Sequence, residues 1–123
     1  MKRVYVAGKF SGNNVLDVLK NIGKGKFACT KMFSLGLDPF CPWADMDYVI
    51  FNPDGDFNVE RFYQYSISWL KVSEILYILS GWRESKGAMI EISIAKKLNI
   101  PIYYQDDISI EDFAKEVLNE RIR

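Results

Sequence analysis

The run Ile75-Leu76-Tyr77-Ile78-Leu79 constrains the fold of this chain more than any other segment. Every side chain in it is apolar or aromatic, and such continuous runs are typical of strands buried on both faces at the centre of a parallel sheet. Shorter strands are predicted at residues 4–7, at 38–43 and at 100–104, the last interrupted by Pro101. The prolines in 38–43 place that segment at a sheet edge or at a point where the strand leaves the sheet.

Segments with helical periodicity separate these strands. Apolar residues spaced by three and four predict helices over about 15–35, 58–72 and 87–98 and from Ser109 onward, with Asn58 and Ser109 as N-caps. Gly23 and Gly25 leave the middle of the first helix uncertain. Residues 44–57 are predicted to form a loop with a short extended piece at 48–51. The alternation predicts an α/β fold with a mainly parallel sheet, in one domain over residues 1–123.

The composition excludes several classes of function. Sixteen basic and sixteen acidic residues cancel, which argues against binding of nucleic acid polymers. The absence of histidine excludes Ser-His and Cys-His catalysis and histidine metal sites. Cys29 and Cys41 are too few for a zinc site or a disulfide scaffold, and the acidic segment 45–56 does not match an EF-hand. No apolar stretch approaches the ~18 residues of a membrane span, so we expect a soluble cytoplasmic protein with free thiols and without metal or cofactor.

Two loops follow predicted strands at the sheet edge where parallel α/β proteins bind ligands. Residues 8–14 and 80–86 both contain Gly, Ser and Lys, which suit a small anion or a sugar near helix N-termini. Neither loop is a Walker A motif, and the Gly-rich stretch 23–28 follows a helical segment, which disfavours a dinucleotide site. Trp43 and Trp82 lie near these strand ends, where they either stack on an aromatic ring of a ligand or cover the core.

Glu91 is the strongest candidate for a catalytic residue. Its helical neighbours at three and four positions are all small or apolar, namely Gly87, Ala88, Ile94 and Ala95. The carboxylate therefore faces the sheet or a cavity and has no basic partner on its own helix. Such a group is unfavourable unless it lines a solvated pocket or its pKa is raised. The alternative is a side chain turned to the helix edge and hydrogen-bonded to water or to a backbone amide.

Two stretches carry a family resemblance. Residues 5–12 (Y-V-A-G-K-F-S-G) and 81–91 (G-W-R-E-S-K-G-A-M-I-E), followed by Ala95 and residues 100–102, resemble the nucleoside 2-deoxyribosyltransferase-like superfamily, which includes 2′-deoxynucleoside 5′-phosphate N-hydrolases. Order and spacing agree over most of the chain except residues 20–58. The resemblance implies a flavodoxin-like (Rossmann-like) three-layer sandwich, a nucleoside or nucleotide substrate and a homodimer or larger homo-oligomer.

The resemblance also implies roles for individual residues. Glu91 aligns with the nucleophile that attacks the anomeric carbon and forms a covalent glycosyl ester. Tyr5 aligns with the tyrosine that orients this glutamate, and Ser85 with the serine that holds a 5′-phosphate in the hydrolases. Together with the residues singled out above, the predicted substrate-binding set is Gly8, Lys9, Ser11, Gly12, Trp43, Ser66, Gly81, Trp82, Ser85 and Gly87.

Two positions depart from the family pattern. Ser66 stands where the family has an Asp, which leaves the departing base without an obvious proton donor, and Lys9 follows Gly8 where the hydrolases use an Arg. The function therefore keeps alternatives: N-glycosidic hydrolysis or transfer, or a catalytically silent nucleotide-binding or sensing protein on the same scaffold. A flavin-binding flavodoxin relative is disfavoured, because the loop after the first strand lacks a Ser/Thr-rich phosphate pattern.

Overall fold

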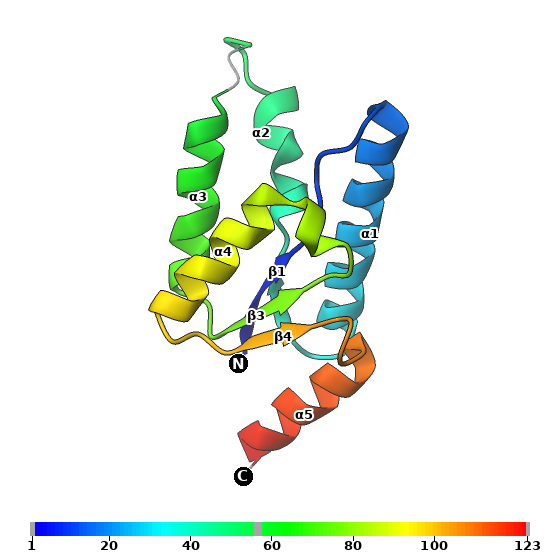
Figure 1. Ribbon diagram of the computed structural model, residues 1–123, viewed down its shortest axis with the longest axis vertical. Coiled ribbons are helices and arrows are strands. Elements are labelled where there is room, and N and C mark those ends of the chain that lie inside the picture. Colours follow the sequence, from blue (N-terminus) through cyan, green and yellow to red (C-terminus); the bar gives the residue numbers. More distant parts are fainter. Residues whose placement is uncertain (1, 56–57, 123) are drawn as a thin grey trace.

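A four-stranded parallel sheet forms the centre of the molecule in the computed structural model, which describes residues 2–55 and 58–122 (Figure 1). The strands are β1 (Arg3–Ala7), β2 (Asp38–Phe40), β3 (Ile75–Ile78) and β4 (Ile102–Tyr104), in the spatial order β2-β1-β3-β4. Every pair is parallel, and Tyr5 of β1 lies in register with Phe40 of β2 and Leu76 of β3. The predicted α/β fold with a parallel sheet is confirmed.

The helices are α1 (Val15–Ser34), α2 (Asp47–Ile50), α3 (Val59–Lys71), α4 (Lys86–Lys97) and α5 (Ile110–Ile122), with 3₁₀ turns η1 (Pro42–Met46) and η2 (Trp82–Glu84). Four helices begin at a polar side chain that accepts a hydrogen bond from the backbone N–H three residues later. These N-caps are Asn14, Asn58, Ser85 and Ser109, with donor–acceptor distances of 2.9, 3.2, 3.1 and 3.2 Å respectively. The N-caps predicted at Asn58 and Ser109 are confirmed.

The prediction of an extended piece at residues 48–51 is wrong, because α2 covers Asp47–Ile50. Pro42 occupies the start of η1, where its fixed φ favours a helical turn, and the helical backbone continues through Asp47 into α2. Tyr48 then packs edge-on against Tyr65 of α3, with 5.5 Å between the ring centroids. Residues 56 and 57 of the predicted loop lie outside the described residues.

Two strand boundaries differ from the prediction. The strand predicted over 38–43 ends at Phe40, because Pro42 begins η1. The last strand begins at Ile102, because Pro101 has no N–H to donate and takes part only through its carbonyl, which accepts from the Leu76 N–H at 2.9 Å. The first helix is continuous through both glycines. A Cβ on Gly25 would lie 2.1 Å from Cδ2 of Trp43, so glycine is what allows the indole of Trp43 to pack against α1.

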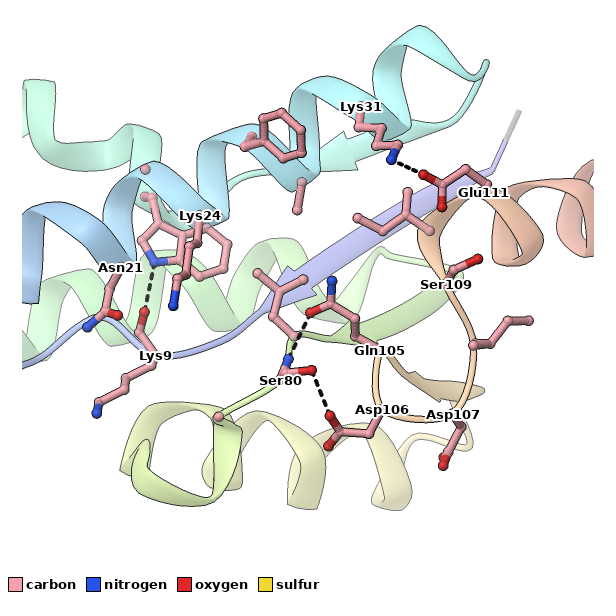
Figure 2. A pocket seen from close by; sticks show the side chains of 18 of the residues that line it. Lys9, Asn21, Lys24, Lys31, Ser80, Gln105, Asp106, Asp107, Ser109 and Glu111 are labelled. Carbon is pink, nitrogen blue, oxygen red and sulfur yellow. Dashed lines mark hydrogen bonds and ion pairs between the residues drawn. The ribbon is translucent and has the colours of Figure 1, made fainter.

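Hydrogen bonds tie the strand ends together at the carboxyl edge of the sheet. The Ser80 backbone N–H, after β3, donates to Gln105 Oε1 at 3.0 Å, and the Ser80 hydroxyl donates to Asp106 Oδ1 at 2.6 Å (Figure 2). Between the inner strands, the Leu79 N–H donates to the Ala7 carbonyl at 2.8 Å. The segments that follow β1, β3 and β4 are therefore linked to one another by hydrogen bonds at the edge of the sheet where ligands are expected.

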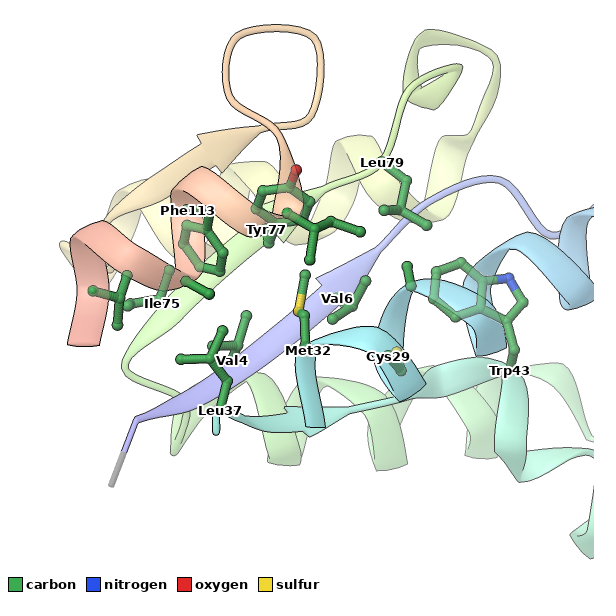
Figure 3. Packing of buried hydrophobic residues seen from close by; sticks show 14 residues of the cluster. Val4, Val6, Cys29, Met32, Leu37, Trp43, Ile75, Tyr77, Leu79 and Phe113 are labelled. Atoms are coloured by element: carbon green, nitrogen blue, oxygen red, sulfur yellow. The ribbon is translucent and has the colours of Figure 1, made fainter. Parts of the chain in front are cut away.

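Alternate residues of β1 face two different helical layers. Val4 and Val6 pack with α1 and α5 in one apolar cluster (Figure 3). Tyr5 and Ala7 face the other layer, where α3 and α4 contribute Leu70, Ala88, Ile92 and Ala95. The sheet is thus covered on both faces, and the three-layer sandwich implied by the resemblance is confirmed.

Candidate active site

A cavity of about 810 Å³ lies between α3, α4 and the η1–α2 segment, beyond the carboxyl end of β1. Crevices in this position are the usual ligand sites of open α/β sheets. Its wall is largely apolar and is formed by Met46, Val49, Val59, Phe62, Ile67 and Ile90. Its polar floor brings together Tyr5 from β1, Ser66 from α3, Ser85 from the N-cap of α4 and Glu91 from the middle of α4.

Glu91 combines burial with an unused hydrogen-bond acceptor. Its Oε2 atom is buried and has no hydrogen-bond partner among the described residues. Burial raises the pKa of the Glu91 carboxyl to about 7, and hydrogen bonding with Tyr5 acts in the opposite direction. A carboxyl group in a cavity that titrates near neutral pH, with one free oxygen, is equipped to bind a donor or to attack an electrophilic carbon.

Tyr5, on the central strand β1, is hydrogen-bonded to Glu91. The Tyr5 side chain is fully buried, and its ring stacks on Phe40 of β2 at 5.2 Å between centroids. Its hydroxyl interacts through hydrogen bonds with Glu91 and with Ser66. Burial, followed by the nearby charge of Glu91, raises the pKa of Tyr5 far above its usual range, so the hydroxyl keeps its proton and donates to the carboxylate.

Gly87 leaves open space beside the carboxyl group. A Cβ at this position would find Glu91 Oε1, Ser85 Oγ and Tyr63 Cε1 each at 3.9 Å, which is ordinary van der Waals distance. The three side chains therefore surround a gap one helical turn from Glu91 instead of filling it. Ser85 Oγ also accepts from the Ala88 N–H at 3.1 Å and donates to the Gly8 carbonyl at 3.5 Å, which ties α4 to the loop after β1.

The loop after β1 is held in place from two sides. Trp43 Nε1 donates to the Lys9 carbonyl at 3.2 Å, and Asn21 donates to the Ser11 carbonyl at 3.1 Å. The Lys9 ammonium forms an ion pair with Glu84, just before the N-cap of α4. Part of the cationic charge of Lys9 is therefore already neutralised at the mouth of the cavity.

The structure brings most of the predicted site residues to this cavity. Those that line it are Tyr5, Gly8, Lys9, Ser11, Trp43, Ser66, Ser85, Gly87 and Glu91. Trp43 is almost completely buried and supports the cavity from the core, with its ring edge against Gly8.

Gly12, Gly81 and Trp82 lie elsewhere in the described structure. Gly12 allows a close approach to α1, since an added Cβ would lie 2.4 Å from Asp17 Cβ. Gly81 adopts a positive φ of 88° at the start of η2 and faces a different hollow. Trp82 stacks on Tyr104 at 5.4 Å, so it covers the core. Of the two roles considered for Trp82, the packing favours the second.

Sequence reasoning missed the contribution of the η1–α2 segment. Asp45, Met46 and Val49 line the cavity from this side, and Asp45 is half-buried there. Burial raises the pKa of the Asp45 carboxyl above its usual value. These residues were not predicted as part of the site because the segment 44–57 was predicted as a loop. The spacing of the apolar residues Met46, Val49 and Ile50 was a signal that could have indicated a helical turn.

A second hollow of about 1060 Å³ lies on the opposite side of Trp43, between α1 and the loop before α5 (Figure 2). Its polar groups are largely paired with each other: Lys31 with Glu111, Ser80 with Asp106, and the Ser80 amide with Gln105. Charges of both signs line it, and no carboxylate there is buried and unpartnered among the described residues. The cavity that holds Glu91 is therefore the better candidate for chemistry.

Residues 2–55 and 58–122 also show the state of the cysteines and whether a metal cluster or a membrane-spanning helix is present. Cys29 and Cys41 are free thiols, as expected. In this part of the chain no three acidic or cysteine side chains gather in a way that would hold a metal ion, and no helix is both long and apolar enough to cross a bilayer.

The strand order and the cavity at the carboxyl edge define a flavodoxin-like α/β protein. A family model described as Domain of unknown function (DUF4406) matches residues 2–104, and the chain belongs to this family. No curated protein matches the sequence closely enough to count as a relative.

A solved structure with the same fold is that of a 2-deoxyribosyltransferase from the psychrotolerant bacterium Bacillus psychrosaccharolyticus, described as a biocatalyst for the synthesis of nucleosides. The match has a TM-score of 0.59 and 18% sequence identity, and it covers 83% of this chain and 70% of that chain. At this level of identity the likeness establishes a shared fold.

Proposed function

We propose that this protein cleaves the N-glycosidic bond of a nucleoside or nucleoside 5′-monophosphate, with Glu91 as the nucleophile. One observation carries the proposal: a carboxyl group with a free, buried Oε2 faces a substrate-sized cavity and is held by a tyrosine on the central sheet. Among the described residues, no salt bridge involves Glu91. A buried carboxyl group without a cationic partner does not stabilise the fold, so a purely structural role does not explain it. A role in binding or attack explains its position.

The chemistry follows the pattern of retaining glycosidases. An oxygen of the Glu91 carboxylate attacks C1′ of the sugar, the C1′–N bond breaks, and its electron pair leaves with the base. The resulting ester is then resolved by water, which gives hydrolysis, or by a second base, which gives transfer. Tyr5 donates a hydrogen bond to the carboxylate and fixes its direction of attack.

The two ends of the cavity suit the two ends of a nucleotide. The apolar wall formed by α2, α3 and Ile90 offers a slot for a flat base, with Phe62 and Tyr63 as aromatic surfaces. At the other end, the first turn of α4, which begins at the Ser85 N-cap, lines the cavity together with Lys9, and the first N–H groups of a helix have no partner within the helix itself. Such a helix N-terminus stabilises an anion, so a 5′-phosphate fits this end.

The comparisons support the proposal at the level of the fold. The structural neighbour described above is a 2-deoxyribosyltransferase used for nucleoside synthesis, and the motifs at residues 5–12 and 81–91 resemble the same superfamily. Both motifs contribute to one cavity in this chain, since the first supplies Tyr5 and Gly8 and the second supplies Ser85, Gly87 and Glu91.

The test is base release measured by chromatography from deoxy- and ribonucleosides and their 5′-monophosphates, with and without a second free base. Glu91→Gln should lower release by at least about 10³-fold, because the amide is not a nucleophile. Glu116→Gln, an exposed glutamate change on α5, is the matched control and should leave release unchanged.

Either of two results contradicts the proposal. Release that survives in Glu91→Gln would remove Glu91 from the mechanism. Absence of release from every substrate, together with a rise in melting temperature on adding one of them, would identify a silent nucleotide-binding protein, the alternative that Ser66 in place of a carboxylate favours.

A further inference from the structure

We infer, on the basis of the function proposed above, that Asp45 is the acid that protonates the departing base and then the base that activates the incoming water. The inference starts from the carboxyl groups of one cavity. Among the described residues, three carboxyl groups line it: Asp45 from η1, Glu84 from η2 and Glu91 from α4. With Glu91 as the nucleophile, the proton must come from one of the other two or from a weaker acid.

Glu84 is not suited to give up a proton. Its side chain is mostly exposed and is paired with the Lys9 ammonium. The hydrogen bond and the charge of Lys9 lower the pKa of the Glu84 carboxyl, so this group is ionised at neutral pH. Ser66 is not suited either, because an alcohol is far too weak an acid and its hydroxyl already interacts with Tyr5.

Asp45 has the environment that a proton donor needs. It is half-buried at the end of η1, and it forms no salt bridge with any described residue. Burial raises the pKa of its carboxyl, which favours the protonated form. A base in the apolar slot beside Met46 and Val49 would remove more water from Asp45 and shift the pKa further in the same direction.

Tyr5 lies near both Glu91 and Asp45. The Tyr5 hydroxyl is hydrogen-bonded to Glu91 and is also near enough to Asp45 for the charge of that carboxylate to act on it. The two carboxyl groups therefore approach Tyr5 from different elements, α4 and η1. A nucleoside in the cavity has its sugar at Glu91 and its base toward Asp45, so the acid stands on the side of the leaving group.

The proton inventory balances over the two steps. In the first step the Glu91 oxygen bonds to C1′, the C1′–N electron pair moves to the base, and the proton of Asp45 moves to a ring nitrogen, so the base leaves neutral. In the second step the Asp45 carboxylate takes a proton from water, the hydroxyl oxygen bonds to C1′, and Glu91 leaves as a carboxylate. Asp45 ends protonated, as it began.

The test compares leaving groups that do and do not need a proton. The substrates are 2′-deoxyguanosine and its 5′-monophosphate, each unmodified and methylated at N7. The methylated base already carries a positive charge and departs without protonation. Asp45→Asn should lower release of guanine by about 10²- to 10⁴-fold, the usual range for a general acid. Release of 7-methylguanine in a single turnover with enzyme in excess, corrected for the uncatalysed rate, should change by less than about threefold. The first step needs no acid for this leaving group, and the water step comes after the base has left.

Two controls separate the possible outcomes. Asp47→Asn, an exposed change two residues away, should affect neither substrate, and Glu91→Gln should lower release from both. Equal losses of single-turnover release from both substrates in Asp45→Asn, or no loss from either, overturn the role of Asp45. In Asp45→Ala, added formate should restore guanine release, and a failure to do so in a variant of wild-type melting temperature also overturns it. Wild-type protein that releases no base from these four substrates or from any other member of the panel above overturns the proposed function, and this inference with it. If only another purine is released, the same comparison is made with that nucleoside and its N7-methylated form.

Discussion

Each face of the sheet is covered by a helix that contains a glycine, and the two glycines have opposite effects on packing. On the α1–α5 face, Gly25 is met by the indole of Trp43, and the packing closes at that point, beside the hollow between α1 and the loop before α5. On the α3–α4 face, Gly87 is met by no atom nearer than 3.9 Å, and the packing opens into the cavity. A glycine on a helix therefore gives close packing where a large ring occupies the space beside it, and leaves part of a cavity where no side chain does.

The difference also separates the polar groups of the molecule. Tyr77, on the closed face, donates its hydroxyl to the Ile108 carbonyl at 2.7 Å, so its polar atom is satisfied inside the fold. Glu91, on the open face, keeps a buried oxygen without a partner among the described residues. Buried polar groups without partners are unfavourable, and they cluster at sites where a ligand completes them.

The largest effect is expected where the closed face is broken. Gly25→Ala should destabilise the protein by about 2–3 kcal/mol, because the new methyl group overlaps the Trp43 ring in a close-packed core. Gly23→Ala is the matched control two residues earlier on the same helix. No atom lies within 4 Å of its new Cβ, so the change should stabilise by about 0.5–1 kcal/mol through helix propensity.

Urea unfolding of the two variants at pH 7 measures this contrast. The same substitution should move the midpoint in opposite directions, with an unchanged slope in each case. A Gly25→Ala protein as stable as the wild type would mean that Trp43 moves away at little cost, and the closed face would then be less tightly packed than its geometry indicates.

An effect of similar size is expected from the buried carboxyl of the open face. Folding raises the pKa of Glu91 from 4.5 to about 7, so the folded state favours the protonated form. Stability from this group is complete below pH 4.5 and is lost as the pH rises through 7. Glu91→Gln removes that loss and should stabilise the protein by about 2–3 kcal/mol at pH 8, and by almost nothing at pH 4.5.

Denaturant unfolding at the two pH values, with Glu116→Gln as the control, checks the sign as well as the size. A Glu91→Gln protein that is less stable than the wild type at pH 8 would show that the carboxylate is stabilised by its surroundings. That result would count against an active-site group held at a cost to stability.

The fold was predictable because its central signals are local and strong. The apolar run at 75–79 corresponds to β3, and caps such as Asn58 and Ser109 mark helix starts through a single side-chain hydrogen bond. The segment 48–51 was not, because its helical state depends on Pro42 and on the contact of Tyr48 with Tyr65, which lies 17 residues away. A prediction from local sequence patterns considers only neighbouring residues and therefore cannot include that contact.

The apolar stripe of α3 shows why the candidate site was only partly predictable. Val59, Phe62, Tyr63, Ile67 and Leu70 have the spacing of a core-facing helix, yet only Leu70 is buried and the others line the cavity. Periodicity reports which face of a helix is apolar, and it does not report whether that face meets a neighbour or a hollow. Asp45 was missed for another reason, because the segment 44–57 was predicted as a loop and only the structure shows that this residue lines the cavity.

The smallest expected effect sharpens the comparison at Gly87 itself. Gly87→Ala adds a methyl group at ordinary contact distance from Glu91 Oε1, Ser85 Oγ and Tyr63 Cε1, so the protein should fold with unchanged stability or gain up to about 1 kcal/mol. The methyl group occupies space that the sugar needs beside the nucleophile. We expect kcat/KM for base release to fall about tenfold, which corresponds to about 1.4 kcal/mol.

Melting temperatures and release rates of Gly87→Ala and Gly23→Ala, measured side by side, decide the point. Both changes place one methyl group on a helix without a clash, so any loss of release confined to Gly87→Ala reports on the cavity. Unchanged release in Gly87→Ala would mean that the substrate does not use this gap, and the open face would owe its shape to something other than catalysis. Together with Gly25→Ala, the series places the same methyl group against a ring, against solvent and against the proposed substrate.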